Sequence, residues 1–172
     1  MTIPRSPDKA EAGRRGARRF ELADIEATQR LAQALAAFLR PGDTIALHGD
    51  LGAGKTALAR ALVQARQSAE GLPVEEVPSP TFTLVQTYEL TEFVIWHFDL
   101  YRLSAPEEAV ELGLEEAAQG VALIEWPDRL GPLLPAARLD LRLAFGNSED
   151  MRLVTLEGST DWAERLAALE AP

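Results

Sequence analysis

The chain is organised around residues 45–65, where a short apolar segment leads into a glycine-rich loop. Ile45–His48 is followed at residues 49–56 by Gly-Asp-Leu-Gly-Ala-Gly-Lys-Thr, a complete G-x-x-x-x-G-K-[ST] phosphate-binding motif. Its glycines let the backbone turn tightly, so that successive N–H groups converge on phosphate oxygens. Ala57–Val63 then supplies strong helix formers. The pattern predicts a buried strand, a phosphate loop and a helix whose positive dipole end faces the anion.

Within this motif, individual residues have distinct expected roles. Lys55 is expected to reach the β- and γ-phosphates of a nucleotide, and the Thr56 hydroxyl is placed to bind Mg²⁺. The loop residues expected to contact the nucleotide are Asp50, Leu51, Gly52, Ala53, Gly54, Lys55, Thr56 and Ala57.

A phosphate loop that uses Mg²⁺ needs a carboxylate on a neighbouring strand. Glu125 ends the apolar run 121–124, which has the pattern of a strand covered on both faces. Asp99 ends the run 94–98. Both acids are expected at the carboxyl ends of strands, where open α/β sheets bind their ligands, and both are candidates.

Segment 79–83, Ser-Pro-Thr-Phe-Thr, lies where P-loop proteins sense the γ-phosphate. Thr81 or Thr83 is a candidate ligand of Mg²⁺ or of that phosphate, although an ordinary loop leading into a strand has a similar composition. The position of His97 between two aromatic residues favours a packed histidine over a catalytic base. Trp126 is expected to pack against Glu125 and fix it.

The remaining pattern predicts an α/β fold of the P-loop NTPase type, with three α/β/α layers and a mixed, mainly parallel sheet. Thr83–Leu90 and Phe93–Leu100 are two strand candidates separated by only two residues, which predicts an antiparallel hairpin.

Further elements are expected from caps and short apolar runs. Asp24 is a candidate N-cap of a helix, and Phe20–Leu22 is a candidate short edge strand. Ser104-x-x-Glu107 predicts a capping box, with Val110 and Leu112 of its helix facing inward. Two strands around residues 146–147 and a closing helix bearing Trp162 complete the expected elements.

Composition bounds the organisation of the 172 residues, of which 47% are apolar. We expect a flexible basic arm, residues 1–19, and one P-loop ATPase domain, residues 20–172. The arm has a net charge of 6 − 2 = +4 and the body has a net charge of −10 − 4 = −14, so the domain is not expected to bind DNA or RNA directly.

No cysteine is present, which excludes disulfides. No run approaches the ~18 apolar residues of a membrane span and no signal peptide is evident, so we expect a cytoplasmic protein without membrane contact.

Several functions share the phosphate loop. The guanine-reading N-K-x-D motif is missing, and Asp128–Gly131 only mimics a GTPase D-x-x-G, so adenine is the expected base by elimination. The alternative is a small-molecule P-loop kinase, which usually needs a lid with arginines; only Arg66 follows the loop helix before the proline-rich segment. A third interpretation is a regulatory module that binds ATP without hydrolysing it.

Four motifs in order resemble the TsaE (YjeE) family: the phosphate loop, residues 79–83, His-Phe-Asp-Leu-Tyr-Arg at 97–102 and Ile-Glu-Trp-Pro-Asp-Arg at 124–129. The resemblance covers residues 20–156 and implies a P-loop ATPase that binds ATP and Mg²⁺. The chain supplies no obvious extra arginine for the transition state, so we expect a Mg²⁺-dependent ATPase with low intrinsic activity. The resemblance implies a role, with TsaB and TsaD, in forming threonylcarbamoyladenosine on tRNAs that read codons starting with A. The acidic body fits docking of partners better than direct tRNA capture, so we expect the tRNA to be held through these partners.

The resemblance also implies roles for individual residues. Thr56 and Glu125 serve the metal, and Asp99 serves hydrolysis while Lys55 holds the phosphates. Trp126 belongs to the same functional cluster.

Overall fold

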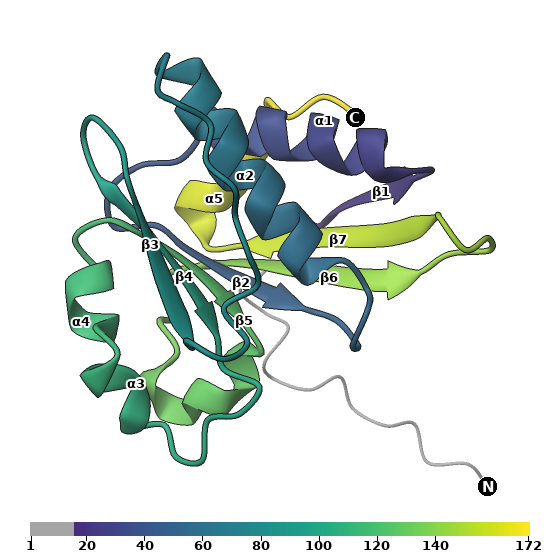
Figure 1. The fold of residues 1–172 in the computed structure, drawn as a ribbon. Helices are drawn as coiled ribbons and strands as arrows, with labels where there is room; N and C mark the ends of the chain where they lie inside the picture. Colours follow the sequence, from purple (N-terminus) through teal and green to yellow (C-terminus); the bar gives the residue numbers. More distant parts are fainter. Residues whose placement is uncertain (1–15) are drawn as a thin grey trace, which may run out of the picture.

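The computed structural model describes residues 16–172, so most of the expected basic arm lies outside the described residues (Figure 1). Strands and helices are interspersed along the chain, with β3–β4 and β6–β7 as consecutive strands. Their bounds are β1 (Arg18–Leu22), α1 (Ile25–Ala36), β2 (Thr44–His48), α2 (Lys55–Ala69), β3 (Val85–Glu89), β4 (Val94–Asp99), α3 (Glu108–Glu111), α4 (Leu114–Ala117), β5 (Val121–Glu125), the 3-10 helix η1 (Pro127–Leu133), β6 (Leu139–Phe145), β7 (Arg152–Gly158) and α5 (Thr160–Leu166).

Seven strands form one sheet in the order β1-β7-β6-β2-β5-β4-β3. The four strands β4, β5, β2 and β6 are parallel, whereas β3, β7 and β1 pair antiparallel with their neighbours. This confirms the mixed sheet and the β3–β4 hairpin. Because the parallel strands run the same way, β2, β4 and β5 all end at one edge of the sheet, and the phosphate loop begins there.

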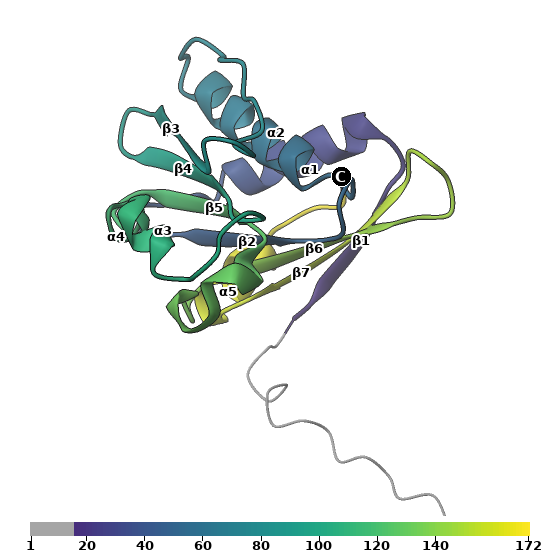
Figure 2. The same cartoon turned by 60° about the horizontal axis from the view of Figure 1, so that its bottom comes forward.

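Helices cover both faces of the sheet, as the three-layer prediction requires (Figure 2). One apolar cluster joins α1 and α2 to the sheet, and Trp162 and Leu166 of α5 belong to it. A second cluster on the opposite face contains Phe98, Ala109, Leu130 and their neighbours from β4, α3, α4, β5 and η1. The alternation of strand residues between these clusters is the period of two expected for a sheet buried on both sides.

The helix ends follow local chemistry. Asp24 caps α1, since its carboxylate accepts a hydrogen bond of 2.8 Å from the backbone N–H of Ala27. Leu31 and Leu35 lie on the buried face of that helix. At the start of α2 the cap is Gly54 with φ +106°, a left-handed conformation that favours glycine and lets the loop turn directly into the helix.

The predicted capping box does not form. The helix begins at Glu108, and neither Ser104 nor the cap residue Glu107 makes a side-chain cap bond. Leu103 is instead buried in the second cluster, so the next residues make bends and a turn before the helix can start. This late start places Ala109 inward and leaves Val110 exposed, which corrects the predicted inward position of Val110, whereas Leu112 packs partly buried against the second cluster as predicted.

At the amino-terminal side, β1 includes Arg18 and Arg19, which the sequence analysis assigns to the arm. β1 pairs with β7 over its whole length. Within residues 16–172, every helix is too short or too polar to cross a bilayer.

A polar link joins β2 to β6 beside the phosphate loop. His48 Nε2 lies 2.7 Å from Asp140 Oδ1, and Arg138 Nε donates to the same oxygen at 2.9 Å. Burial acts to raise the pKa of Asp140, but the hydrogen bonds from His48 and Arg138 and their positive charge outweigh it and lower the pKa from 3.8 to about 2. The folded protein therefore favours the ionised carboxylate.

We predict that Asp140→Asn removes a pH-dependent part of the stability. A carboxylate with a lowered folded-state pKa stabilises the fold above its unfolded pKa of 3.8, and this contribution is lost as the pH falls towards about 2. Urea unfolding of wild type and variant between about pH 5 and about pH 2.5 should show a free-energy difference that narrows as the pH falls.

Asp128→Asn is the matched control, because Asp128 is exposed on η1. This variant should stay close to wild type at every pH. A difference for Asp140→Asn that stays constant with pH would contradict the prediction.

Candidate functional site

A pocket of about 220 Å³ lies at the carboxyl edge of the parallel strands. The phosphate loop forms one wall, and the ends of β4 and β5 form the other. Its lining residues are Leu51, Gly52, Gly54, Lys55, Thr56, Ala57, Ser79, Thr81, Asp99, Glu125 and Trp126.

Lys55 is buried at the base of this pocket and held by the loop itself. Its Nζ donates hydrogen bonds to the backbone carbonyls of Gly49 and Asp50. Burial lowers the pKa of Lys55, while the charges of Glu125, Asp99 and Asp50 act in the opposite direction. Among the described residues that line this pocket, Lys55 is the one basic side chain, so its ammonium group is positioned to meet an anionic ligand.

Trp126 covers Lys55 from the side of β5. Its ring centroid lies 4.1 Å from the Lys55 Nζ, a cation–π distance, and 4.9 Å from the ring centroid of Tyr101. The backbone of Trp126 has φ +58°, a left-handed conformation that is uncommon for a bulky residue. This turn directly after Glu125 directs the indole over the pocket, so Trp126 does more than pack behind the acid.

Thr56 and Glu125 meet across the pocket. The Thr56 hydroxyl lies 2.9 Å from Oε1 and 3.0 Å from Oε2 of Glu125. In the parallel register of β4 and β5, Asp99 lies opposite Glu125. The two candidate acids are therefore neighbours, and both face the start of α2.

The segment before β3 also contributes. Thr81 donates a hydrogen bond of 3.3 Å to Asp99 Oδ2, and the Ser79 and Thr81 hydroxyls lie 2.7 Å apart. The backbone N–H of Tyr101 donates to the other oxygen of Asp99 at 3.1 Å. Thr83 lies outside the pocket lining, where its hydroxyl accepts a bond from Gln86. Of the two threonines considered, Thr81 is the one that lines the site.

The chemistry of these groups fits Mg²⁺. A hydroxyl and a carboxylate oxygen are hard ligands, which Mg²⁺ prefers. In the part of the chain that the structure describes, no three acidic or histidine side chains gather to form a complete metal cage. An ion shared between one or two protein ligands and phosphate oxygens is the usual arrangement for Mg²⁺ at such sites.

A second pocket of about 400 Å³ adjoins the first and shares Gly54 and Ala57 with it. Its other side is formed by the start of α1 and by the β6–β7 region. Arg152 lines it and donates to the carbonyl of Ala53 at 3.1 Å, which ties β7 to the phosphate loop. The remaining lining residues are Asp24, Ile25, Glu26, Thr28, Ala53, Leu143 and Asp150.

The structure brings most of the predicted site residues together. Of that set, Asp50 and Ala53 do not line the first pocket: Asp50 contributes its carbonyl to Lys55, and Ala53 is buried beside the second pocket.

The second pocket and the contact of His97 with Glu125 were not predicted from the sequence. His97 is fully buried, but its Nε2 also lies 2.7 Å from Glu125 Oε1. No local pattern signals either feature, because His97 and Glu125 lie 28 residues apart in the sequence, and Arg152 and Ala53 lie 99 residues apart.

Comparisons with known proteins agree with this arrangement. The family profile described as "Threonylcarbamoyl adenosine biosynthesis protein TsaE" matches residues 22–154. The protein named TsaE from Rickettsia felis is 44% identical over 147 residues, which is 85% of this chain and 83% of the relative. The protein of that name from Bacillus subtilis is 40% identical over 131 residues, 74% of this chain and 78% of the relative.

A solved structure shares the fold as well. The crystal structure of Bacillus subtilis YdiB matches with a TM-score of 0.68 at 30% identity, covering 88% of this chain and 91% of that chain. The phosphate loop, the mixed sheet and the matches in sequence agree: the chain belongs to the TsaE family, whose role is in tRNA threonylcarbamoyladenosine biosynthesis.

Proposed function

We propose that the chain binds ATP together with Mg²⁺ and hydrolyses it slowly, in support of tRNA modification carried out with TsaB and TsaD. The observation that carries this proposal is the convergence of Thr56, Glu125 and Asp99 on the pocket that contains Lys55. A phosphate loop facing one acid for the metal and a second acid for the attacking water supplies the groups that nucleotide hydrolysis uses.

Each group in the pocket has a defined task in this proposal. The loop N–H groups and Lys55 hold the β- and γ-phosphates. Thr56 and Glu125 would hold Mg²⁺, and the ion would supply positive charge that offsets the charge developing on the phosphate oxygens. Asp99 accepts a proton from the water that attacks the γ-phosphorus, while the bond from that phosphorus to the β–γ bridging oxygen breaks and ADP leaves.

Asp99 is well placed for this task. Hydrogen bonds from Thr81 and from the Tyr101 N–H fix its carboxylate at both oxygens. A fixed carboxylate orients water without having to reorganise during the reaction.

The second pocket is suited to the base of the nucleotide. It is continuous with the loop through Gly54 and Ala57 and has apolar walls at Ile25 and Leu143. We assign adenine to it because the residues that would read guanine are missing from the sequence.

Arg66, the arginine considered for the lid of a kinase, is engaged in other contacts. Arg66 donates to Glu70 at 2.9 Å, and its guanidinium lies 5.3 Å from the centroid of Phe93. These contacts engage Arg66 at the end of α2 that is remote from the phosphate loop. This supports hydrolysis over transfer of phosphate to a small molecule.

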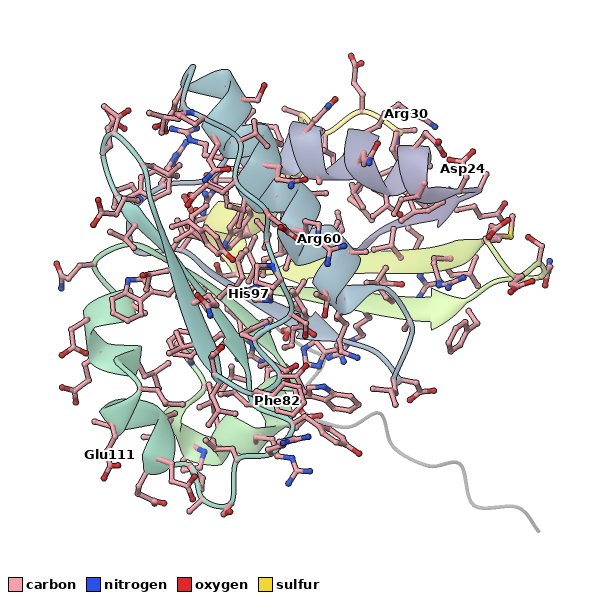
Figure 3. All side chains as sticks on the ribbon, in the orientation of Figure 1. Asp24, Arg30, Arg60, Phe82, His97 and Glu111 are labelled. Carbon is pink, nitrogen blue, oxygen red and sulfur yellow. The ribbon has the colours of Figure 1, made fainter. Side chains whose placement is uncertain are left out.

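Exposed apolar side chains near the pocket support docking of partner proteins there. Leu51 is 75% exposed and Phe82 is 81% exposed, and Figure 3 shows Phe82 beside the site. Arg102 lies 4.6 Å from the ring centroid of Phe82. The acidic body fits the same proposal, in which tRNA is held by TsaB and TsaD rather than by this chain.

The direct test is phosphate release from ATP by the purified protein, alone and then with TsaB and TsaD, with tRNA modification followed in the same samples. Slow release that rises with the partners and is needed for repeated rounds of modification is the expected result. Transfer of phosphate to a metabolite without any effect on tRNA would establish the kinase alternative.

We predict that Asp99→Asn separates binding from hydrolysis. The amide cannot accept a proton, so phosphate release should fall by about 100-fold or more, whereas ATP affinity should change little. Calorimetric ATP binding and a phosphate-release assay measure the two effects.

Asp128→Asn repeats the same chemical change at the exposed acid of the D-x-x-G mimic, three residues after Glu125. It should leave phosphate release unchanged. Unimpaired turnover by Asp99→Asn would remove Asp99 from the mechanism.

We predict that Ile25→Glu weakens nucleotide binding through the second pocket. Ile25 is 51% exposed at the start of α1, so the variant should fold, but it places a carboxylate where an apolar wall meets the base. Affinity for ATP and for ADP should fall by roughly 5- to 10-fold, about 1 kcal/mol, as measured by calorimetry.

Val74→Glu is the matched control for Ile25→Glu. Val74 is 56% exposed and lies outside both pockets. Its substitution should not change either affinity, and an equal loss in the two variants would argue against the base pocket.

A further inference from the structure

His97 is the buried histidine that the proposed hydrolysis leaves without a role. It lies on β4 two residues before Asp99, so both side chains project from the same face of the strand, the face on which Ile95 packs into the cluster with α1 and α2. Figure 3 labels His97. Its side chain is completely buried, and its Nε2 lies 2.7 Å from Glu125 Oε1. Because an ionised carboxylate only accepts hydrogen bonds, the Nε2–H of His97 is the donor.

The bond from His97 completes the fixation of Glu125. The one hydrogen of the Thr56 hydroxyl is shared between Oε1 at 2.9 Å and Oε2 at 3.0 Å, whereas the His97 N–H donates to Oε1 and, among the bonds of the described residues, not to Oε2. Two donors on different elements, β4 and α2, prevent the carboxylate from rotating. Oε2 is the oxygen that keeps more of its capacity to accept a further partner in the pocket.

The environment of the other ring nitrogen, Nδ1, indicates that the hydrogen bond to Glu125 explains the presence of a histidine at position 97. Nδ1 of His97 is buried and, in residues 16–172, has no hydrogen-bond partner. A buried polar atom without a partner is unfavourable, and an apolar residue would avoid that cost. The strand around it is apolar, with Ile95 and Phe98 fully buried. The hydrogen bond to Glu125 is therefore the one polar contact that the histidine supplies.

We infer that His97 is a positioning residue for Mg²⁺: through its Nε2–H it holds the Glu125 carboxylate in the orientation that binds the ion beside Thr56. This inference rests on the proposed function, because it needs Glu125 to serve the metal. Partners of metal ligands commonly raise metal affinity by about 10- to 100-fold through such orientation.

The test uses binding and not turnover. Wild type, His97→Leu and His97→Gln are titrated with Mg²⁺ at a fixed concentration of a fluorescent, non-hydrolysable ATP analogue. The Mg²⁺ concentration that gives half of the Mg²⁺-dependent gain in analogue binding should rise by about 10-fold or more in His97→Leu. His97→Gln retains an amide donor and should restore most of the gain. Binding of the analogue in EDTA should be the same in all three.

His48→Leu is the matched control. His48, the other histidine of the chain, also lies 2.7 Å from a carboxylate, that of Asp140, but it does not line the pocket. Its loss should leave the Mg²⁺ dependence within about twofold of wild type. An equal rise in His48→Leu and His97→Leu would reflect general loosening of the sheet and would overturn the inference.

A double-mutant comparison decides the outcome if His97→Leu folds poorly. His97→Gln and His97→Asn are then compared alone and with Glu125→Gln; Asn, one methylene shorter, should lose the contact that Gln keeps. The difference between Gln and Asn should vanish with Glu125→Gln, because His97 acts through that carboxylate.

The failures of the two ideas are distinguishable. Wild type that binds the analogue without any dependence on Mg²⁺ would overturn the proposed function, and the role of His97 with it. If analogue binding by wild type depends clearly on Mg²⁺ and the Mg²⁺ titration curve of His97→Leu coincides with that of wild type, only the role of His97 is overturned.

Discussion

The parallel register of β2, β5 and β4 is the constraint on which the site depends. It places Leu47 opposite Glu125 and Glu125 opposite Asp99. The end of β2, which carries the phosphate loop, is therefore level with both acids across the sheet. A shift of one residue in either pairing would turn an acid to the opposite face, because side chains alternate along a strand. The buried runs of β2 and β5 oppose such a shift, since it would also exchange the residues of the two apolar clusters. The packing of the core thus sets the geometry of the chemistry.

Much of this could be predicted because the signals are local. The phosphate loop carries its own backbone geometry, and short apolar runs that end in an acid locate β4 and β5. The start of α3 could not be predicted from its capping pattern, because burial of Leu103 decided where the chain could turn. The bond between His97 and Glu125 and the wall formed by Arg152 depend on residues far apart in the chain. Such contacts exist only once the strands are ordered side by side, and no short window of sequence contains them.

The pocket concentrates polar groups that cost stability. Lys55, His97, Asp99 and Glu125 are all at most 5% exposed, in a region where unpaired charges are unfavourable. Each of these groups meets an opposite charge or a hydrogen-bond partner on another element. The left-handed backbone of Trp126 adds strain at the same place. The apolar clusters on the two faces of the sheet offset these costs, and departures from local preference gather where the ligand is expected to bind.

The ends of the described chain meet in the same part of the fold. β1, the first strand, pairs with β7, and Arg165 of α5 donates hydrogen bonds of 2.8 Å to both carboxylate oxygens of Asp43, directly before β2. The strand that carries the phosphate loop is thus anchored at its start by the last helix. On a ribosome, β2 leaves the exit tunnel long before β6, β7 and α5 have been made. β5 can pair with one side of β2 earlier, but the other side of the central strand has no partner until β6 has been made. A buried strand with one unpaired edge is prone to wrong pairing, so the order in which the strands are made, and not only the length of the chain, sets how long the nascent protein is open to aggregation.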